Sequence, residues 1–314
     1  MPCRRMFLFL TLTIWLAAAL PTNLSAEPAA KPSDAERQHA TGLRILSTGH
    51  SWVAPAMRTL PKIAAGANLD DHRQRYHLRG GAGGSAQAIW AAEHGTKGKK
   101  REILLPLIAS GEWDVLTMGS YYFDKPEHYT PWIDYCLKHN PKMTFLIQDG
   151  WARVPKRTKS TALKLEMFLP QQKKIDNTIK AIVDTLNAKY PGKIRVIPVG
   201  AAMAEMLRLY FAGKLPGIDG VSQHLGSRHA LYRDGGHLCG NSGMEWFEGY
   251  VYYAALYKKS PELIEFKSKV PNDKLDKIMR RVAWKAVVDY PLARIDDKNK
   301  NGIADEIEKA ADQR

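Results

Sequence analysis

Short apolar runs alternate with amphipathic segments along most of the chain. The runs at residues 43–49 (LRILSTG), 113–120 (WDVLTMGS), 142–151 (KMTFLIQDGW) and 193–200 (KIRVIPVG) are typical of strands that are buried on both faces. The longest amphipathic segment, residues 169–190, places apolar residues on one helical face, namely Ile175, Ile179, Ile182, Val183 and Leu186. Strands joined in this way by helices predict a mainly parallel sheet that is covered by helices on both faces.

The other segments extend this pattern to a three-layer α/β/α sandwich. A short strand is predicted at 75–78, and a last core helix within 237–257. Further helices are predicted at 52–67, 86–95, 102–111, 131–140, 201–213 and 272–288. In such a sheet ligands bind beyond the carboxyl ends of the strands. Ser51, Gly84 and Ser120 each follow a strand, so we expect them to gather at that edge.

Both ends of the chain differ in composition from the body. Arg4 and Arg5 precede an apolar run from 6 to 20 and a polar stretch that ends at Ala26, which predicts a secretory signal peptide at 1–26 and an exported protein. The apolar run is short for a membrane span, so no stable span is expected after cleavage, although an uncleaved anchor is the alternative. Residues 27–41 indicate a linker, 42–290 a single domain with its packing helix, and 291–314 a separate tail.

Charge and cysteine content leave several partners open. The formal net charge is +14, and removal of residues 1–26 with Arg4 and Arg5 leaves +12. The basic clusters indicate either a solvated surface or an acidic or sulfated glycan partner. No nucleic-acid motif accompanies the charge, so a nucleic-acid partner is not predicted. Cys136 and Cys239 could form a disulfide in an exported protein or remain two isolated buried thiols.

Two short motifs, 180 residues apart, carry the candidate chemistry. Ser51 stands at a strand-to-helix turn, which can present its hydroxyl at the carboxyl edge of the sheet. Asp234 precedes His237 by three residues in a glycine-rich turn, so the two could act together as a base and the group that orients it. Taken alone, Ser51 is more simply a helix N-cap, and His237 a surface histidine.

The order and spacing of these motifs over residues 42–255 resemble the SGNH (GDSL-like) hydrolase superfamily. The resemblance implies a flavodoxin-like α/β/α fold and hydrolysis of carboxylic esters, often acyl groups on carbohydrate, with no cofactor for the chemistry. It implies Ser51 as nucleophile, His237 as general base and Asp234 as the group that orients the imidazole. It also implies an oxyanion hole from the N–H of Ser51, a glycine N–H, best matched by Gly84 with Gly83 close behind, and a third donor.

The sequence departs from the family pattern at two places. His50 stands where the family usually has Asp or Asn, and the third block, Gly119-Ser120-Tyr121-Tyr122, lacks the usual Asn. The hydroxyl of Ser120, or that of Tyr121, would have to serve as the third donor. We expect His50, Gln148 and Trp151 to line the substrate edge. The missing Asn keeps a non-catalytic, carbohydrate-binding protein of the cell envelope as the alternative function.

Two metal sites come into question. His224 and His229 lie near Asp234 and His237 in the sequence, but their spacing matches no familiar zinc motif, so a metal-dependent hydrolase is a minor alternative. Residues 297–308 (DKNKNGIADEIE) resemble thrombospondin-type-3 and EF-hand calcium loops. The predicted ligands of this structural Ca²⁺ are Asp297, Asn299, Asn301, the carbonyl of Ile303, Asp305 and Glu308. A solvated acidic tail is the alternative.

Overall fold

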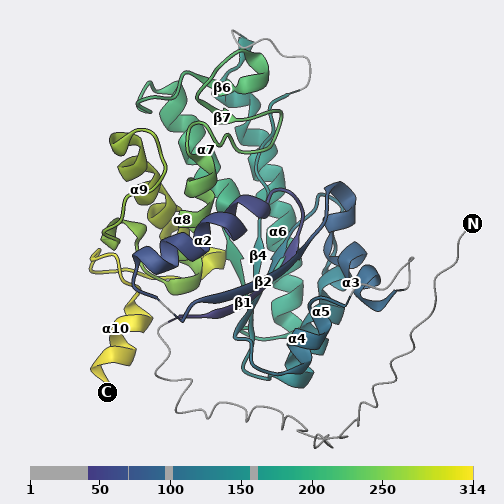
Figure 1. Cartoon of the computed structure of the whole chain (residues 1–314). Helices are drawn as coiled ribbons and strands as arrows, with labels where there is room; N and C mark the ends of the chain where they lie inside the picture. The colour runs from purple at the N-terminus through teal and green to yellow at the C-terminus, as the bar shows by residue number, and fades with distance from the viewer. Residues whose placement is uncertain (1–41, 70, 96–101, 156–161, 314) are drawn as a thin grey trace, which may run out of the picture.

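The computed structural model describes residues 42–69, 71–95, 102–155 and 162–313 (Figure 1). The predicted signal peptide and linker therefore lie outside the described residues. Within them, no helix has both the length and the apolar character needed to cross a bilayer.

A five-stranded, fully parallel sheet forms the centre of the molecule, in the order β2-β1-β3-β4-β5. This order is that of flavodoxin-like folds. The sequence-based prediction of a three-layer α/β/α sandwich is thus confirmed. The strands are β1 (Arg44–Gly49), β2 (Arg73–Leu78), β3 (Val115–Gly119), β4 (Thr144–Gln148) and β5 (Ile194–Ile197).

Helices cover both faces of this sheet (Figure 1). One face is covered by α2 (Ala54–Gly66), α7 (Val199–Phe211) and α8 (Met244–Tyr257), with α9 (Asp273–Asp289) packed on α7 and α8. The other is covered by α3 (Ala86–His94), α4 (Leu105–Ala109), α5 (Pro126–His139) and α6 (Leu169–Lys189). Neighbouring strand residues enter opposite cores: Ile45 packs with the first set of helices and Leu46 with the second. This burial on both faces explains the nearly continuous apolar runs of the strands.

Several smaller elements complete the chain, and the sequence pattern did not predict them. The strands β6 (Gly220–Ser222) and β7 (Ala230–Tyr232) form a second, two-stranded parallel sheet just before the Asp234–His237 turn. The helix α10 (Asp305–Asp312) follows the predicted calcium loop. Short 3₁₀ turns are η1 (Gly81–Gly84), η3 (Leu165–Met167), η4 (Gln223–Leu225), η5 (Pro261–Leu263) and η6 (Pro291–Ala293).

The two cysteines of the described chain do not pair. Cys136 on α5 and Cys239 after β7 are both buried free thiols. Burial raises the pKa of the Cys136 thiol, because the thiolate would lose its hydration. Of the two possibilities that the sequence left open, the structure therefore has the isolated thiols.

The first helix after Ser51 is held against the core by a close contact with α8. A Cβ atom added at Gly249 on α8 would lie 2.2 Å from Oγ1 of Thr59 and 2.8 Å from Cδ1 of Ile63, both on α2. The Thr59 hydroxyl has little freedom to move, since it donates to the Pro55 carbonyl at 2.9 Å. The two helices can approach this closely only because residue 249 has no side chain.

We expect Gly249→Ala to destabilise the protein by about 1–3 kcal/mol, because overpacking outweighs the helix propensity of Ala. Urea unfolding followed by circular dichroism measures the change. Gly80→Ala is the matched control, since an added Cβ there meets nothing within 4 Å and φ is −70°; its effect should stay within about 0.5 kcal/mol. Equal stability of the two variants would contradict the close α2–α8 contact.

Candidate active site

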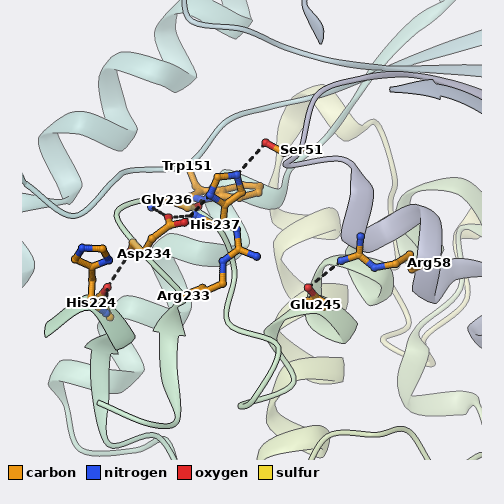
Figure 2. A network of polar contacts seen from close by, with 10 residues as sticks. Ser51, Arg58, Trp151, His224, Arg233, Asp234, Gly236, His237 and Glu245 are labelled. Atoms are coloured by element: carbon orange, nitrogen blue, oxygen red, sulfur yellow. Dashed lines mark hydrogen bonds and ion pairs between the residues drawn. The ribbon is translucent and has the colours of Figure 1, made fainter. Parts of the chain in front are cut away.

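The nucleophile candidate lies in the turn between β1 and α2, at the carboxyl edge of the sheet. β1 ends at Gly49 and α2 begins at Ala54, and the turn is closed by a hydrogen bond from the N–H of Val53 to the carbonyl of His50 at 2.9 Å. A Cβ at Gly49 would lie 2.5 Å from Cγ2 of Val53, so the tightness of the turn requires a glycine there. Ser51 is half-buried, and its hydroxyl is directed toward His237 (Figure 2).

The base candidate, His237, contacts this serine although it lies far from it in the sequence. Nε2 of His237 lies 2.9 Å from Oγ of Ser51, and Nδ1 lies 2.8 Å from Oδ2 of Asp234. A carboxylate beside Nδ1 favours the tautomer with the proton on that nitrogen. Nε2 then has a free lone pair that can accept the proton of the serine hydroxyl. The structure thus brings together the three residues that the sequence motifs singled out, 186 positions apart in the case of Ser51 and His237.

The Asp234 carboxylate is held by the backbone of its own turn. Its Oδ1 accepts hydrogen bonds from the N–H groups of Gly236 and His237, each at 2.8 Å. Partial burial raises the pKa of Asp234, but the N–H groups of His237 and Gly236, together with the imidazole, lower it more, to about 2. Asp234 is therefore ionised across the neutral range, as a group that stabilises a developing imidazolium must be.

Contacts with two other segments hold the Asp234–His237 turn in place. The indole N–H of Trp151 donates to the carbonyl of Gly236 at 2.7 Å, as Figure 2 shows, and the N–H of Val154 donates to the carbonyl of Gly235 at 2.9 Å. From the small sheet, the hydroxyl of Ser222 donates to the carbonyl of Asp234 at 2.9 Å. The base is consequently fixed to the segment after β4 as well as to β6.

The two other predicted oxyanion residues lie beside the nucleophile turn. A Cβ at Gly84 would be 2.5 Å from Cβ of His50 and 2.6 Å from the carbonyl oxygen of Gly49. Gly84 is thus in direct contact with the turn, and any larger residue would displace it. Ser120 lies at the end of β3, where its N–H donates to the Gln148 carbonyl at 3.1 Å. Only its hydroxyl is therefore left for an oxyanion.

The tyrosine considered as an alternative donor has its own N–H engaged as well. The N–H of Tyr121 donates to Oδ2 of Asp124 at 2.7 Å. The third block can therefore serve an oxyanion only through side-chain hydroxyls, whereas the usual Asn would supply an amide.

The structure corrects the prediction for the three substrate-lining residues, because all three are buried. His50 donates from Nε2 to the carbonyl of Ser120 at 2.8 Å, while its Nδ1 faces the N–H of Trp52 at 3.4 Å. Burial lowers the pKa of His50, more than the bond to Ser120 raises it, so the imidazole is neutral near pH 7. It joins the nucleophile turn to the end of β3.

Gln148 and Trp151 are buried and both contact Trp52, the residue after Ser51. Oε1 of Gln148 accepts the hydroxyl of Tyr252 at 2.5 Å, and its Nε2 donates to the carbonyl of Trp52 at 3.4 Å. The indole of Trp151 stacks on that of Trp52, with 4.4 Å between the ring centroids. Sequence reasoning placed both side chains at the surface because a strand end alone does not tell which way its last residues point.

Trp52 and Arg153 are site residues that the sequence reasoning missed. Trp52 directly follows the nucleophile, and the guanidinium of Arg153 lies 5.8 Å from the centroid of its indole ring. Only the position of Trp52 beside Ser51 could have indicated its place in the site. The sequence placed Arg153 in a basic cluster at 153–159, which gave no indication of its position over Trp52.

The histidines considered for a metal site do not gather around one. Over the ranges that the structure describes, no three His, Cys, Asp or Glu side chains are grouped so as to hold a metal ion. The ring of His229 pairs instead with Asp219, at 3.9 Å, and His224 lies in the short turn after β6 (Figure 2).

The predicted calcium loop is closed by hydrogen bonds within itself. Oδ1 of Asp297 accepts from the N–H of Asn301 at 3.1 Å and Oδ2 from the N–H of Gly302 at 3.1 Å. The side-chain amides of Asn299 and Asn301 both donate to the carboxylate of Glu308. Four of the six predicted ligands are thus neighbours, and Ca²⁺ would require both amides to turn their oxygens inward.

The two remaining predicted ligands lie at the start of α10 (Asp305) and two residues before it (Ile303). Asp305 is its first residue, and its Oδ1 accepts from the N–H of Lys298 at 2.9 Å. Ile303 forms an isolated antiparallel bridge with Lys259, which attaches the loop to the domain.

Comparisons with known proteins bear on the fold. No family model matches the chain, and no curated protein matches it. Among solved structures, a DUF4886 family protein from Bacteroides uniformis is similar, with a TM-score of 0.54 and 15% identity over 80% of this chain and 96% of its own. At this identity the likeness shows a shared fold alone. A proposed GDSL-like lipase from Parabacteroides merdae aligns with a TM-score of 0.36 and 14% identity over 66% and 94% of the two chains, too weakly to support a conclusion.

The pKa of Asp234 predicts a pH dependence of stability. Its folded value of about 2 lies below the ordinary 3.8. The charged carboxylate therefore stabilises the fold fully above pH 3.8, and this contribution disappears as the pH falls through the folded value. We expect the difference in unfolding free energy between wild type and Asp234→Asn to shrink from pH 5 to pH 2, measured by urea unfolding. In a His237→Ala background the stability difference that Asp234→Asn makes should still shrink over this pH range, because the backbone N–H donors to Asp234 remain. A difference that stays constant from pH 5 to pH 2 would contradict the lowered pKa of Asp234.

Calcium binding to the tail loop is a second prediction, and Trp284 offers a reporter. Its indole N–H donates to Oδ2 of Asp297 at 2.9 Å. Calcium should therefore release heat in calorimetry and change tryptophan emission, with a Kd on the order of 10⁻⁴–10⁻³ M, as in extracellular modules. Asn301→Ala should abolish both signals and Lys309→Ala, outside the loop, should keep them. Chelator-treated wild type that gives no heat would rule the site out.

Proposed function

We propose that this chain is an exported serine hydrolase that cleaves carboxylic esters, with acyl groups on carbohydrate as the substrate class. One observation carries the proposal: the hydroxyl of Ser51, the imidazole of His237 and the carboxylate of Asp234 form a continuous hydrogen-bonded series, with spacings of 2.9 and 2.8 Å. A serine becomes a nucleophile when a neighbouring base can take its proton and a third group orients that base.

The proposed reaction proceeds through an acyl-enzyme. Oγ of Ser51 attacks the ester carbonyl carbon while Nε2 of His237 takes the hydroxyl proton, and Asp234 stabilises the imidazolium. Collapse of the tetrahedral intermediate breaks the bond to the alcohol, which leaves with the proton from His237. Water then attacks the acyl group on Ser51, again with His237 as the base, and releases the acid. No step requires a cofactor.

The oxyanion of this intermediate needs donors, and here the proposal rests on Ser51, Gly84 and Ser120. We assign the N–H groups of Ser51 and Gly84 and the hydroxyl of Ser120 to this role. Removal of one such donor typically slows catalysis by about 10²–10³. A hydroxyl that rotates freely is a less preorganised donor than a fixed amide, so Ser120 makes this chain a slower enzyme than the usual Asn would.

The altered third block also favours a second candidate, a carbohydrate-binding protein of the cell envelope that keeps the fold without catalysis. Its supporting observation is that the N–H groups of Ser120 and Tyr121 are both engaged within the protein. The hydrogen bond between Ser51 and His237 favours the enzyme, because a binding protein has no need of an activated serine.

Labelling with a fluorophosphonate, followed by peptide mass mapping, separates the two functions. We expect the label on Ser51 in the wild type, and its loss in Ser51→Ala and His237→Ala, because only a deprotonated hydroxyl attacks phosphorus at a useful rate. His229→Ala is the matched control, because the native His229 pairs with Asp219 and not with the serine. This variant should be labelled like the wild type.

The labelling result on the wild type decides between the two candidate functions. Folded wild-type protein that takes no label would overturn the enzyme and favour the binding protein. The same peptide map tests export, which is proposed from residues 1–26: the protein isolated from its natural source should begin near residue 27.

A further inference from the structure

A row of rings crosses the nucleophile turn from one exposed end to the other. From Tyr122 the row passes to Tyr121 (4.9 Å between centroids), then to His50 (5.3 Å) and to Trp52 (5.7 Å). The guanidinium of Arg153 continues it, 5.8 Å from the Trp52 ring. Ser51 stands between His50 and Trp52 in the chain, so the row extends to both sides of the nucleophile.

The Tyr122 end offers apolar area to solvent. Tyr122 is 85% exposed and Phe123 38%, an unusual display for two adjacent aromatic rings. The loop is fixed rather than loose, because Oδ2 of Asp124 accepts both the N–H of Tyr121 at 2.7 Å and the hydroxyl of Tyr129 at 2.8 Å. A rigid exposed ring of this kind suits the apolar C–H face of a sugar, which gains from stacking while its hydroxyls stay in water.

The Arg153 end offers a positive charge beside the residues that neighbour Ser51 and His237. Its guanidinium lies over the indole next to Ser51, and a Cβ at Gly236, the residue before His237, would be 3.0 Å from its Nε. Its backbone is held by the side chain of Gln171, through contacts of 3.4 and 3.3 Å. No ion pair joins Arg153 to a carboxylate in the part of the chain that the structure describes. By contrast, the nearby Arg233 lies 3.6 Å from Asp234.

We propose that the substrate is an oligosaccharide chain that spans the nucleophile turn above the buried His50, with one sugar ring on Tyr122 and an anionic group, carboxylate or sulfate, on Arg153. The proposal rests on the ester hydrolase proposed above and adds what that site selects. A planar guanidinium held against an aromatic ring offers parallel N–H donors that match either anion. Tyr122 and Arg153 thus determine specificity without taking part in the bond changes.

Binding to the Ser51→Ala variant tests this independently of turnover. The probes are three tetrasaccharides, namely xylotetraose, tetragalacturonate and a sulfated galactan tetrasaccharide, measured by calorimetry. We expect an anionic probe to bind at least tenfold more tightly than xylotetraose. A tenfold ratio of affinities corresponds to the net free energy of about one charge-assisted hydrogen bond. The tighter of the two anionic probes identifies carboxylate or sulfate as the natural group, and the preference should weaken in 1 M salt.

Second substitutions in the same background assign the effect to residues. Arg153→Gln should remove the charge preference while it leaves xylotetraose affinity unchanged, and Arg153→Lys should retain part of it. Tyr122→Ala should weaken all three probes several-fold, as loss of a stacking surface does. Arg281→Gln is the matched control, an exposed arginine on α9 that pairs with Glu262 and should change nothing.

The outcomes separate this inference from the proposed function. Equal affinity for the three probes, a preference that survives Arg153→Gln, or no binding at all would overturn the inference, even if the wild type is labelled at Ser51. If the wild type takes no label but the Arg153-dependent preference is present, the hydrolase fails and the anionic glycan site stands.

Discussion

The hydrogen bond from the indole of Trp151 to the carbonyl of Gly236 is the contact on which the candidate site depends most. It attaches the turn that carries the base to the segment after β4. The same indole stacks on Trp52, the neighbour of the nucleophile. One buried side chain thus contacts the residues next to both Ser51 and His237. A smaller residue would leave a buried carbonyl without its donor and remove the surface against which both turns rest.

A second layer of contacts holds Trp151 itself. The side-chain amide of Gln172 on α6 donates to the carbonyl of Gly150 at 3.2 Å and accepts the N–H of Ala152 at 3.0 Å. It thus forms hydrogen bonds with the residues on both sides of the tryptophan. Burial raises the pKa of Asp149 well above its usual range, although its Oδ1 accepts the N–H of Gly200 at 2.7 Å. Through this hydrogen bond the carboxyl joins the segment after β4 to the first turn of α7. The base turn is supported in this way by α6 and α7, two elements distant from it in sequence.

Much of this arrangement could be predicted from the sequence. The parallel sheet followed from runs such as 113–120, and the α/β/α layers from the helical segments between them. The sequence also singled out Ser51 and the Asp234–His237 turn, which the structure brings into contact. These predictions worked because periodicity and turn chemistry are local properties of the chain.

The parts that failed depend on tertiary contacts. The direction of Gln148 and Trp151 is set by Tyr252 and Trp52, which lie far away in sequence, so a strand-end rule could not find it. The place of Arg153 over Trp52 has the same cause. Local sequence thus indicated Ser51, Asp234 and His237, which the structure brings into contact, but it could not indicate which residues surround them.

The separation of 186 positions between Ser51 and His237 determines when the two residues can meet during synthesis and folding. During synthesis Ser51 is made 186 residues before His237, so the two side chains cannot meet until both have left the ribosome. The two meet only after β1, β4 and the small sheet have taken their places. A chain that has not yet reached His237, or that is unfolded, thus carries an ordinary serine hydroxyl, and the Ser51–His237 hydrogen bond exists only in the folded protein.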